Sequence, residues 1–290
     1  MRTTIKLTAA VAAAAALTLG LSACSAPSDT SSSGSGKKGK DADPKATLVV
    51  AASPTPHADI LYYVRDNLAE KAGLKLEVKE FNDYVLPNTA TQNGEVDANF
   101  FQHKPYLDDF NKKNKTDIVP VVNVEIEPLG LYSKKIDKVA DITSGNTVAV
   151  PNDATNEGRA LKLLADNGVI ELKDGVGSNA KLSDIEDKKG VKFTELAADQ
   201  VPSRLADVDA AVINGNFAIG AKLNPAKDAL ALEKAEGNPY ANFLAVKKGN
   251  EADPRIEKLS KLLNSDDVKK FIEKKFSNGA VLPAFGKAQS

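Results

Sequence analysis

The sequence predicts an α/β protein of two similar lobes, which are joined by two crossover strands and separated by a cleft. Three observations support this fold class. The same order of strands and helices occurs twice along the chain, and two long extended runs lie where the chain would pass between the lobes. Residues 81–107 combine aromatic and amide side chains, as expected for one wall of a small-molecule pocket.

The first copy of the repeated pattern follows the N-terminal segment. Residues 47–52 form a short apolar run with branched side chains, which is typical of a buried strand. A helix with one apolar face follows over residues 60–68, and residues 74–79 alternate like a half-buried strand. A short helix over residues 87–93 then leads through Val-Asp-Ala into a third strand that begins at Asn99.

The second copy has the same order of elements. Residues 147–151 resemble the first strand, and Thr155 opens a helix with leucines as its apolar content. A strand over residues 191–196 and a short helix over residues 202–208 follow, and a second Val-Asp-Ala leads into a strand over 211–214. The shared order is stronger evidence than any single match, and it predicts two similar α/β lobes.

Two extended runs without a helical period, residues 118–132 and 240–246, are interpreted as the crossovers between the lobes. The helices predicted within residues 254–276 would then pack back on the first lobe. The predicted limits are 47–126 with 243–290 for the first lobe, and 127–242 for the second.

Residues 1–23 are predicted to be a signal peptide. Two early positive charges precede an apolar run over residues 7–19, which is shorter than the roughly 20 residues needed to cross a bilayer. Leu-Ser-Ala-Cys at the end of this run resembles a bacterial lipobox, in which the cysteine is acylated. Cys24, the only cysteine in the chain, would therefore carry the lipid, such as palmitate. The alternative is an ordinary secretory signal with an incidental cysteine.

Residues 24–46 are expected to form a flexible tether. This segment is rich in Ser, Gly and Lys, and it is too polar to bury the surface that would offset its ordering entropy. A lipid, a tether and a globular body together predict a protein that is anchored to the cell membrane on its extracytoplasmic face.

The composition and the motif content of the chain argue against several classes of function. A net charge of -1 gives no reason to expect nucleic acid as a partner, because phosphate binding needs a basic face. No serine or cysteine has a histidine nearby, no phosphate-binding loop occurs, and no metal-ligand spacing is present, so neither a cofactor nor a metal is expected. The prediction is a binding protein without catalysis. A lipid-anchored enzyme on the same scaffold and an adhesin with a vestigial cleft are the alternatives.

Several side chains are assigned from their local context. Phe100 and Phe101 would face opposite sides of a strand, with Phe100 in the core and Phe101 in the cleft. His103 is interpreted as a neutral hydrogen-bonding wall of the pocket, because no second ligand for a metal is near it in the sequence. His57, at the start of the first helix, is placed on the surface or the cleft rim. Asp97 and Asp209, one in each Val-Asp-Ala, are given structural roles at their turns.

Several sequence words match a known family. They are FNDYVLPN (81–88), FQHKPYL (101–107), YSKKI (132–136), VPND with the following TN and GR (150–159), LKDGVG (172–177), AVIN (211–214), PAKD (225–228) and PY (239–240). With these words the chain resembles the methionine-binding lipoproteins of the NlpA family, the solute-binding components of bacterial methionine ABC importers. The resemblance extends from residue 47 to about residue 285.

The resemblance implies a periplasmic-binding-protein-like fold of type II, with lobes that close on the ligand. It implies methionine in its L or D form, or a methionine-containing dipeptide, as the ligand, and an ABC permease with its ATPase subunit as partners of a monomer. Carried over by position, the thioether pocket is Tyr84, Phe101, His103 and Tyr106, the carboxylate is held by Arg159, and the other polar atoms are held by Asn156 and Asn214. Gly215-Asn216-Phe217 departs from the family pattern, which has Thr and Tyr there, so no role is assigned to this turn.

Arg159 also has a physical reason to bind a carboxylate. It is expected in the first turn of the helix opened by Thr155, where exposed N–H groups and the helix dipole favour an anion. Its guanidinium would add a two-pronged, charge-assisted contact. The alternatives are that Arg159 faces solvent and that Asn214 only forms a turn.

Overall fold

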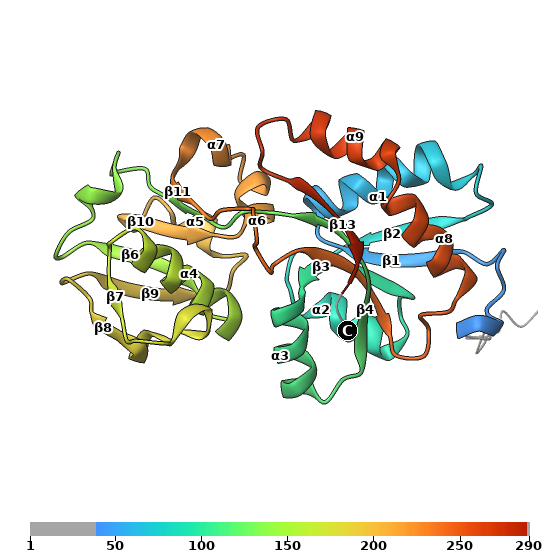
Figure 1. Ribbon diagram of the computed structural model, residues 1–290, viewed down its shortest axis with the longest axis horizontal. Helices are drawn as coiled ribbons and strands as arrows, with labels where there is room; N and C mark the ends of the chain where they lie inside the picture. Colours follow the sequence, from blue (N-terminus) through green and yellow to red (C-terminus); the bar gives the residue numbers. More distant parts are fainter. Residues whose placement is uncertain (1–38, 289–290) are drawn as a thin grey trace, which may run out of the picture. The chain divides into compact units, whose positions relative to one another are not determined.

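The computed structural model describes residues 39–288, and the chain is drawn in Figure 1. The predicted signal peptide, Cys24 and the tether up to residue 38 lie outside these residues. The last part of the predicted tether contains the short 3₁₀ helix η1 (Gly39–Asp41), and Ala42 after it is only 4% exposed, so this part packs on the body. None of the helices within residues 39–288 has the length and apolar content of a membrane span.

One part of the structure, called lobe I here, is built on a six-stranded sheet with the order β13-β4-β12-β3-β1-β2. Its strands are β1 (Leu48–Ala52), β2 (Leu76–Glu80), β3 (Ala98–His103), β4 (Ile118–Ile126), β12 (Asn242–Lys247) and β13 (Leu282–Lys287). Strand β1 pairs in parallel with β2 and β3, whereas β12 is antiparallel to β3 and β4. The first three predicted strands are therefore confirmed.

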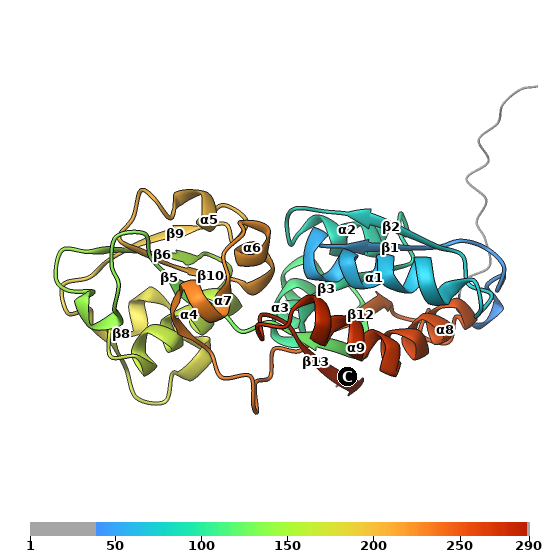
Figure 2. The same ribbon diagram turned by 90° about the horizontal axis from the view of Figure 1, so that it is seen from above.

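Helices cover both faces of this sheet (Figures 1 and 2). They are the continuous segment η2 (Pro54–Ala58), α1 (Asp59–Val64) and η3 (Arg65–Ala69), followed by α2 (Leu86–Asn93), α3 (Lys104–Asn114), α8 (Pro254–Leu263) and α9 (Asp266–Lys275). Val50 and Ala52 of β1 pack with α1, α8 and α9, whereas Ala51 faces α2 on the other side. This alternation follows from the two-residue period of a strand. The prediction that the C-terminal helices return to the first lobe is confirmed.

Lobe II is built on a five-stranded sheet with the order β11-β5-β10-β6-β9. Its strands are β5 (Gly130–Tyr132), β6 (Thr147–Pro151), β9 (Lys192–Leu196), β10 (Ala210–Ile213) and β11 (Ala229–Leu232), with the separate hairpin of β7 (Glu171–Leu172) and β8 (Ile185–Asp187). Its helical elements are α4 (Ala154–Asp166), α5 (Val201–Arg204), α6 (Gly215–Gly220), α7 (Pro225–Asp228) and the 3₁₀ turns η4 (Val139–Asp141), η5 (Gly177–Asn179) and η6 (Leu182–Asp184). Helix α4 packs on one face of the sheet, and α5 and α6 pack on the other.

The two lobes repeat the same unit, as the sequence predicted. Strand β6 pairs in parallel with β9 and β10, as β1 does with β2 and β3. The twin aspartates have matching structural roles, because Asp97 accepts a hydrogen bond from the N–H of Val49 at 2.9 Å, and Asp209 accepts one from Thr147 at 2.8 Å. Each carboxylate ties the turn before the third strand of its lobe to the first strand. That backbone hydrogen bond also lowers the pKa of Asp209.

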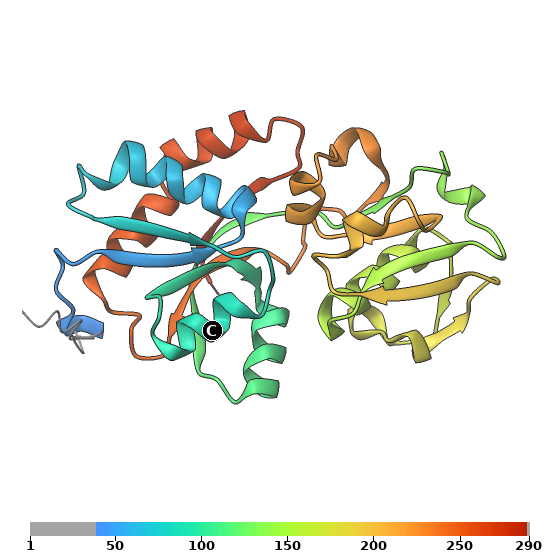
Figure 3. The same cartoon turned by 180° about the vertical axis from the view of Figure 1, so that it is seen from behind.

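The chain crosses between the lobes twice (Figure 3). It leaves lobe I through residues 127–129, between β4 and β5, and returns through residues 233–241, between β11 and β12. The predicted two-lobed α/β fold is confirmed. The predicted helix over residues 202–208 is too long, since α5 ends at Arg204 and the following residues form a turn.

Candidate functional site

A pocket lies where the carboxyl end of β3 meets the first residues of α4 and α6. All seven residues predicted for the site line it: Tyr84, Phe101, His103, Tyr106, Asn156, Arg159 and Asn214. Five further lining residues were not predicted: Gln102, Glu127, Gly215, Asn216 and Asn242. Because α4 follows β6 and α6 follows β10, the pocket lies at the carboxyl ends of parallel strands in both lobes, as ligand sites of open α/β sheets commonly do.

Three aromatic rings form the apolar wall. Tyr84 lies 5.8 Å from Phe101 and 5.6 Å from Tyr106, measured between ring centroids. The hydroxyl of Tyr106 donates to the backbone oxygen of Tyr84 at 2.9 Å, which holds the wall together. Phe100 points the other way and is fully buried in the lobe I core, as predicted.

The turn after Asn214, which departs from the family pattern, contacts this wall from lobe II. The hydroxyl of Tyr84 donates to the side-chain oxygen of Asn216 at 2.5 Å, and the ring of Phe217 lies 4.8 Å from that of Tyr84. Gly215 starts α6 directly against Glu127, because a Cβ at this position would come within 2.6 Å of the Glu127 Cβ. The turn is therefore part of the pocket wall, and glycine is needed for this close approach.

His103 is a neutral residue with a defined tautomer. Its Nδ1 accepts a hydrogen bond from the N–H of Tyr106 at 3.2 Å, so the proton belongs on Nε2, which lies 3.2 Å from Oδ1 of Asn156. Burial, and then the charge of Arg159, lower the pKa of His103 to about 3. The imidazole is therefore a hydrogen-bond donor across the pocket at physiological pH.

Asn156 links the two lobes through one amide group. Its Oδ1 accepts from Nε2 of His103 and from Nδ2 of Asn214, the latter at 3.0 Å. Its Nδ2 donates to the carboxylate of Asp153 at 3.0 Å. Because a carboxylate only accepts hydrogen bonds, Asp153 determines which way the Asn156 amide points.

The predicted start of α4 and the position of Arg159 within it are wrong. The helix begins at Ala154 with Asp153 as its N-cap, and the Asp153 carboxylate accepts from the N–H of Asn156. Aspartate is among the best N-cap residues, so the helix starts directly after Asp153 and not at Thr155. Arg159 consequently lies in the second turn of the helix and not in the first.

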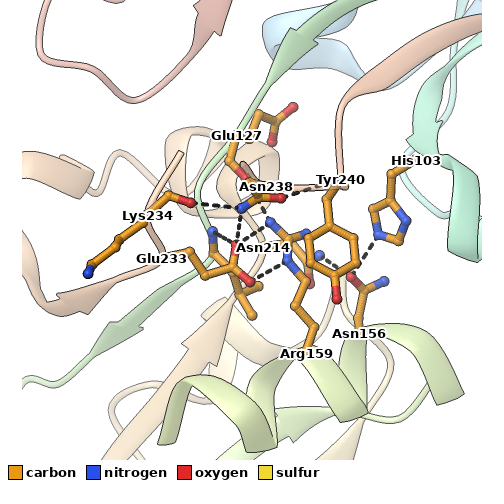
Figure 4. Close-up of polar contacts among 10 residues, drawn as sticks. His103, Glu127, Asn156, Arg159, Asn214, Glu233, Lys234, Asn238 and Tyr240 are labelled. Atoms are coloured by element: carbon orange, nitrogen blue, oxygen red, sulfur yellow. Dashed lines mark hydrogen bonds and ion pairs between the residues drawn. The ribbon is translucent and has the colours of Figure 1, made fainter. Parts of the chain in front are cut away.

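Arg159 is held by a carboxylate that the sequence did not indicate (Figure 4). Its Nε donates to Glu233 at 2.7 Å, and its Nη2 donates both to Glu233 at 2.5 Å and to the backbone oxygen of Glu127 at 3.0 Å. The guanidinium carbon also lies 4.2 Å from the centre of the Tyr240 ring. Arg159 is 4% exposed, so the alternative of a solvent-facing residue is wrong. No hydrogen bond joins its Nη1 to any residue within 39–288, which leaves two N–H donors beside the pocket.

The sequence contained a signal for Tyr240 but none for Glu233. Tyr240 belongs to the Pro-Tyr word that matched the family, so that match was a usable signal. Glu233 is 74 residues from Arg159, and nothing in its local sequence indicates the pairing.

The placement of His57 on the surface or cleft rim is also wrong. His57 is 1% exposed, and its Nε2 lies 3.2 Å from Glu125 and 3.3 Å from Glu127. Burial raises the pKa of both carboxyl groups to about 8 and lowers that of His57. A usable signal was present, because His57 precedes the buried Ile60 and Leu61 by three and four residues and so shares their helical face.

Comparisons with known proteins agree on one family. The methionine-binding lipoprotein MetQ of Bacillus subtilis is 42% identical over 82% of this chain and 88% of its own length. A solved structure of a nutrient-binding protein from Burkholderia cenocepacia bound to methionine matches with a TM-score of 0.79 and 45% identity, over 82% of this chain and all of that one. A periplasmic substrate-binding protein of an ABC transporter from Coxiella burnetii matches with a TM-score of 0.78 and 38% identity, over 82% of this chain and 100% of that one. The family model for the NlpA lipoprotein matches residues 48–285. This chain therefore belongs to the NlpA lipoprotein family.

Proposed function

We propose that this protein is an extracytoplasmic solute-binding lipoprotein that captures methionine and delivers it to an ABC importer. One observation carries the proposal. An apolar aromatic wall meets a buried arginine, whose two Nη1 donors have no partner among residues 39–288, in one pocket between the lobes. The MetQ relative and the methionine-bound structural neighbour support methionine as the ligand.

The ligand carboxylate would bind to Nη1 of Arg159. The other two nitrogens of this guanidinium are committed to Glu233 and to the backbone of Glu127, so the group cannot rotate freely. Glu233 also accepts from the N–H of Leu129 and from the amide of Asn238, which anchors it in turn. A guanidinium fixed in this way loses little conformational entropy when it binds an anion.

The ligand ammonium would donate to Asn214. The Nδ2 of Asn214 is used by Asn156, which leaves its Oδ1 buried and without a hydrogen-bond partner among residues 39–288. A buried acceptor of this kind carries a desolvation penalty of about 1–3 kcal/mol that a ligand donor would remove. Asn242 lines the same pocket from β12 and offers a second amide.

The thioether side chain would lie against Tyr84, Phe101 and Tyr106. Enclosing a side chain of this size is worth about 1.5–3 kcal/mol, and sulfur–aromatic contacts add about 0.3–1.5 kcal/mol. His103 closes this wall as a neutral donor and adds no charge that would repel the ligand ammonium.

We extend the proposal to the parts of the chain around the pocket. The limits are 1–23 for the signal peptide, 24–46 for the lipidated cysteine and tether, 47–126 with 243–290 for lobe I, and 127–242 for lobe II. The partners would be an ABC permease and its ATPase subunit, with the protein acting as a monomer and without catalysis. The transporter relative from Coxiella burnetii supports this role.

Isothermal titration calorimetry with L-methionine, D-methionine, a methionine-containing dipeptide and other amino acids tests the function. We expect one molecule of a methionine compound to bind per chain, and mass spectrometry to recover it unchanged after incubation. Binding of a chemically unrelated amino acid in preference to all three methionine compounds would contradict the ligand assignment. Conversion of the ligand would instead favour an enzyme on the same scaffold.

Substitution of Cys24 by alanine should release the protein from the membrane. The reason is that the only thiol available for acylation is removed, while the pocket stays unchanged. The measurement is the distribution of the protein between membrane and soluble fractions of the producing cells, with Ser25→Ala as the neighbouring control. Retention of the Cys24→Ala chain in the membrane fraction would show that another element anchors it.

A further inference from the structure

A second polar cluster, made of His57, Glu125 and Glu127, lies beside the ligand pocket in lobe I. Five of its atoms are buried and make no hydrogen bond of good geometry among residues 39–288: both ring nitrogens of His57, both carboxylate oxygens of Glu125 and Oε1 of Glu127. Nε2 of His57 is nevertheless within ion-pair distance of both carboxyl groups, and the Asn242 side chain lies beside Glu125. Nearly all buried polar atoms in proteins are hydrogen-bonded. Three of these atoms, one from each residue, lie within 4.8 Å of one another, which indicates that a bound species belongs between them.

The spacing of these atoms fits a metal ion. Nε2 of His57 lies 3.2 Å from Oε1 of Glu125 and 3.3 Å from Oε1 of Glu127. The three residues thus offer one ligand atom each, and these atoms lie within 4.8 Å of one another. A tetrahedral zinc ion with bonds of about 2.0–2.2 Å separates its ligand atoms by roughly 3.3–3.6 Å. Two of the three separations are thus close to those of a filled site.

The chain sets up this geometry from two elements. Glu125 is in β4 and Glu127 follows its last residue, and side chains two residues apart on an extended chain lie on one face. His57 comes from η2, on the face that packs against the sheet, and its ring is held edge-on by Phe100 at 4.7 Å between centroids. The three side chains are therefore fixed by packing before any ion binds.

Charge also favours a divalent cation. Both carboxyl groups are almost completely buried, at 0% and 5% exposure, and ionising them there without a cation costs several kcal/mol. The charge of Arg159 acts on both groups only through space, because its ion pair is with Glu233. One divalent ion would neutralise two carboxylates, with the neutral imidazole as third ligand.

We propose that His57, Glu125 and Glu127 form a binding site for one divalent transition-metal ion of the zinc class. The site joins η2 of lobe I to the first residue of the crossover from lobe I to lobe II. Because Glu127 also lines the ligand pocket, the pocket is the route by which an ion and a coordinating water reach the site. The ion would hold the start of the crossover to lobe I and leave the methionine contacts to other residues.

The test uses the full chain without a histidine tag, stripped with a chelator and then titrated with Zn²⁺ and, separately, with Co²⁺. We expect one equivalent of Zn²⁺ by competition with a chelating dye, one equivalent of Co²⁺ with the visible absorption of a low-coordinate site, and a melting temperature that rises with free Zn²⁺. His57→Gln and the nearly isosteric Glu125→Gln should each abolish the one-equivalent binding. Glu77→Gln, an exposed glutamate of β2, is the matched control and should retain it.

Two results would overturn the proposal: a stripped wild-type chain that binds no ion at one equivalent, or folded His57→Gln and Glu125→Gln chains that bind as the wild type does. The first would mean that shared protons, rather than a metal, neutralise the cluster. Circular dichroism establishes whether each variant is folded. If a variant is not folded, the number of Zn²⁺ ions bound per wild-type chain decides whether the site exists. Methionine calorimetry on the stripped protein is read separately, so loss of the metal site would leave the proposed function standing.

Discussion

Replacement of Arg159 by alanine is expected to weaken methionine binding at least about a hundredfold. The two Nη1 donors have no other partner among the described residues, and a hydrogen bond to a charged group is worth about 1.5–3 kcal/mol. Loss of two such bonds removes roughly 3–6 kcal/mol, and about 1.4 kcal/mol corresponds to a tenfold change in affinity. Calorimetry at constant pH and salt measures the change.

Companion variants separate ligand binding from stability. Alanine at position 159 leaves the Glu233 carboxylate without its partner, so part of the effect is loss of stability. Arg159→Lys retains the positive charge but loses the planar guanidinium with its paired N–H donors. This variant should still bind methionine at least tenfold more weakly than the wild type. Glu233→Gln should have a smaller effect, since it only loosens the guanidinium. Arg204→Ala, an exposed arginine of α5, is the control, and an affinity of Arg159→Lys equal to that of Arg204→Ala would remove Arg159 from the site.

Asn156→Leu should weaken binding by roughly 10- to 100-fold. The variant removes the acceptor shared by His103 and Asn214, and each buried donor left unpaired costs about 1–3 kcal/mol. Asn214 would also lose the contact that directs its Oδ1 to the pocket. Methionine affinity by calorimetry and the melting temperature should therefore both fall.

The matched control for this prediction is Asn167→Leu at the other end of α4. Within the described part of the chain, Asn167 donates only to the backbone oxygen of Leu163, 2.8 Å away, and it does not line the pocket. Its replacement should leave methionine affinity unchanged. If Asn156→Leu bound methionine as tightly as Asn167→Leu, the amide of Asn156 would not contribute to the site.

Much of this protein could be predicted because the relevant signals are local. The repeated order of strands and helices follows from apolar periodicity, which any segment expresses within a few residues of its own sequence. The opposite directions of Phe100 and Phe101 follow from the geometry of one strand, and the structural roles of Asp97 and Asp209 follow from the turns they occupy. The grouping of the seven predicted pocket residues came from the family words rather than from periodicity.

The errors have different physical causes. The start of α4 depended on whether Asp153 or Thr155 capped it, a competition between neighbours that differ by a fraction of a kcal/mol. His57 was misplaced because the partners that make its burial possible are supplied by β4, far along the chain. Phe217 and Asn216 contact the pocket although their local sequence departs from the family pattern.

The sequence by itself determined the two α/β units and the strand ends that carry the site, because each depends on neighbours within one element. The seven predicted pocket residues were grouped by their match to the family words. Only the tertiary structure decided the pairing of Arg159 with Glu233, the hydrogen bonds of Asn156 with His103 and Asn214, and the cluster of His57, Glu125 and Glu127. These contacts join residues that are distant in the chain. Their energies depend on burial and mutual geometry, which exist only after the lobes have folded.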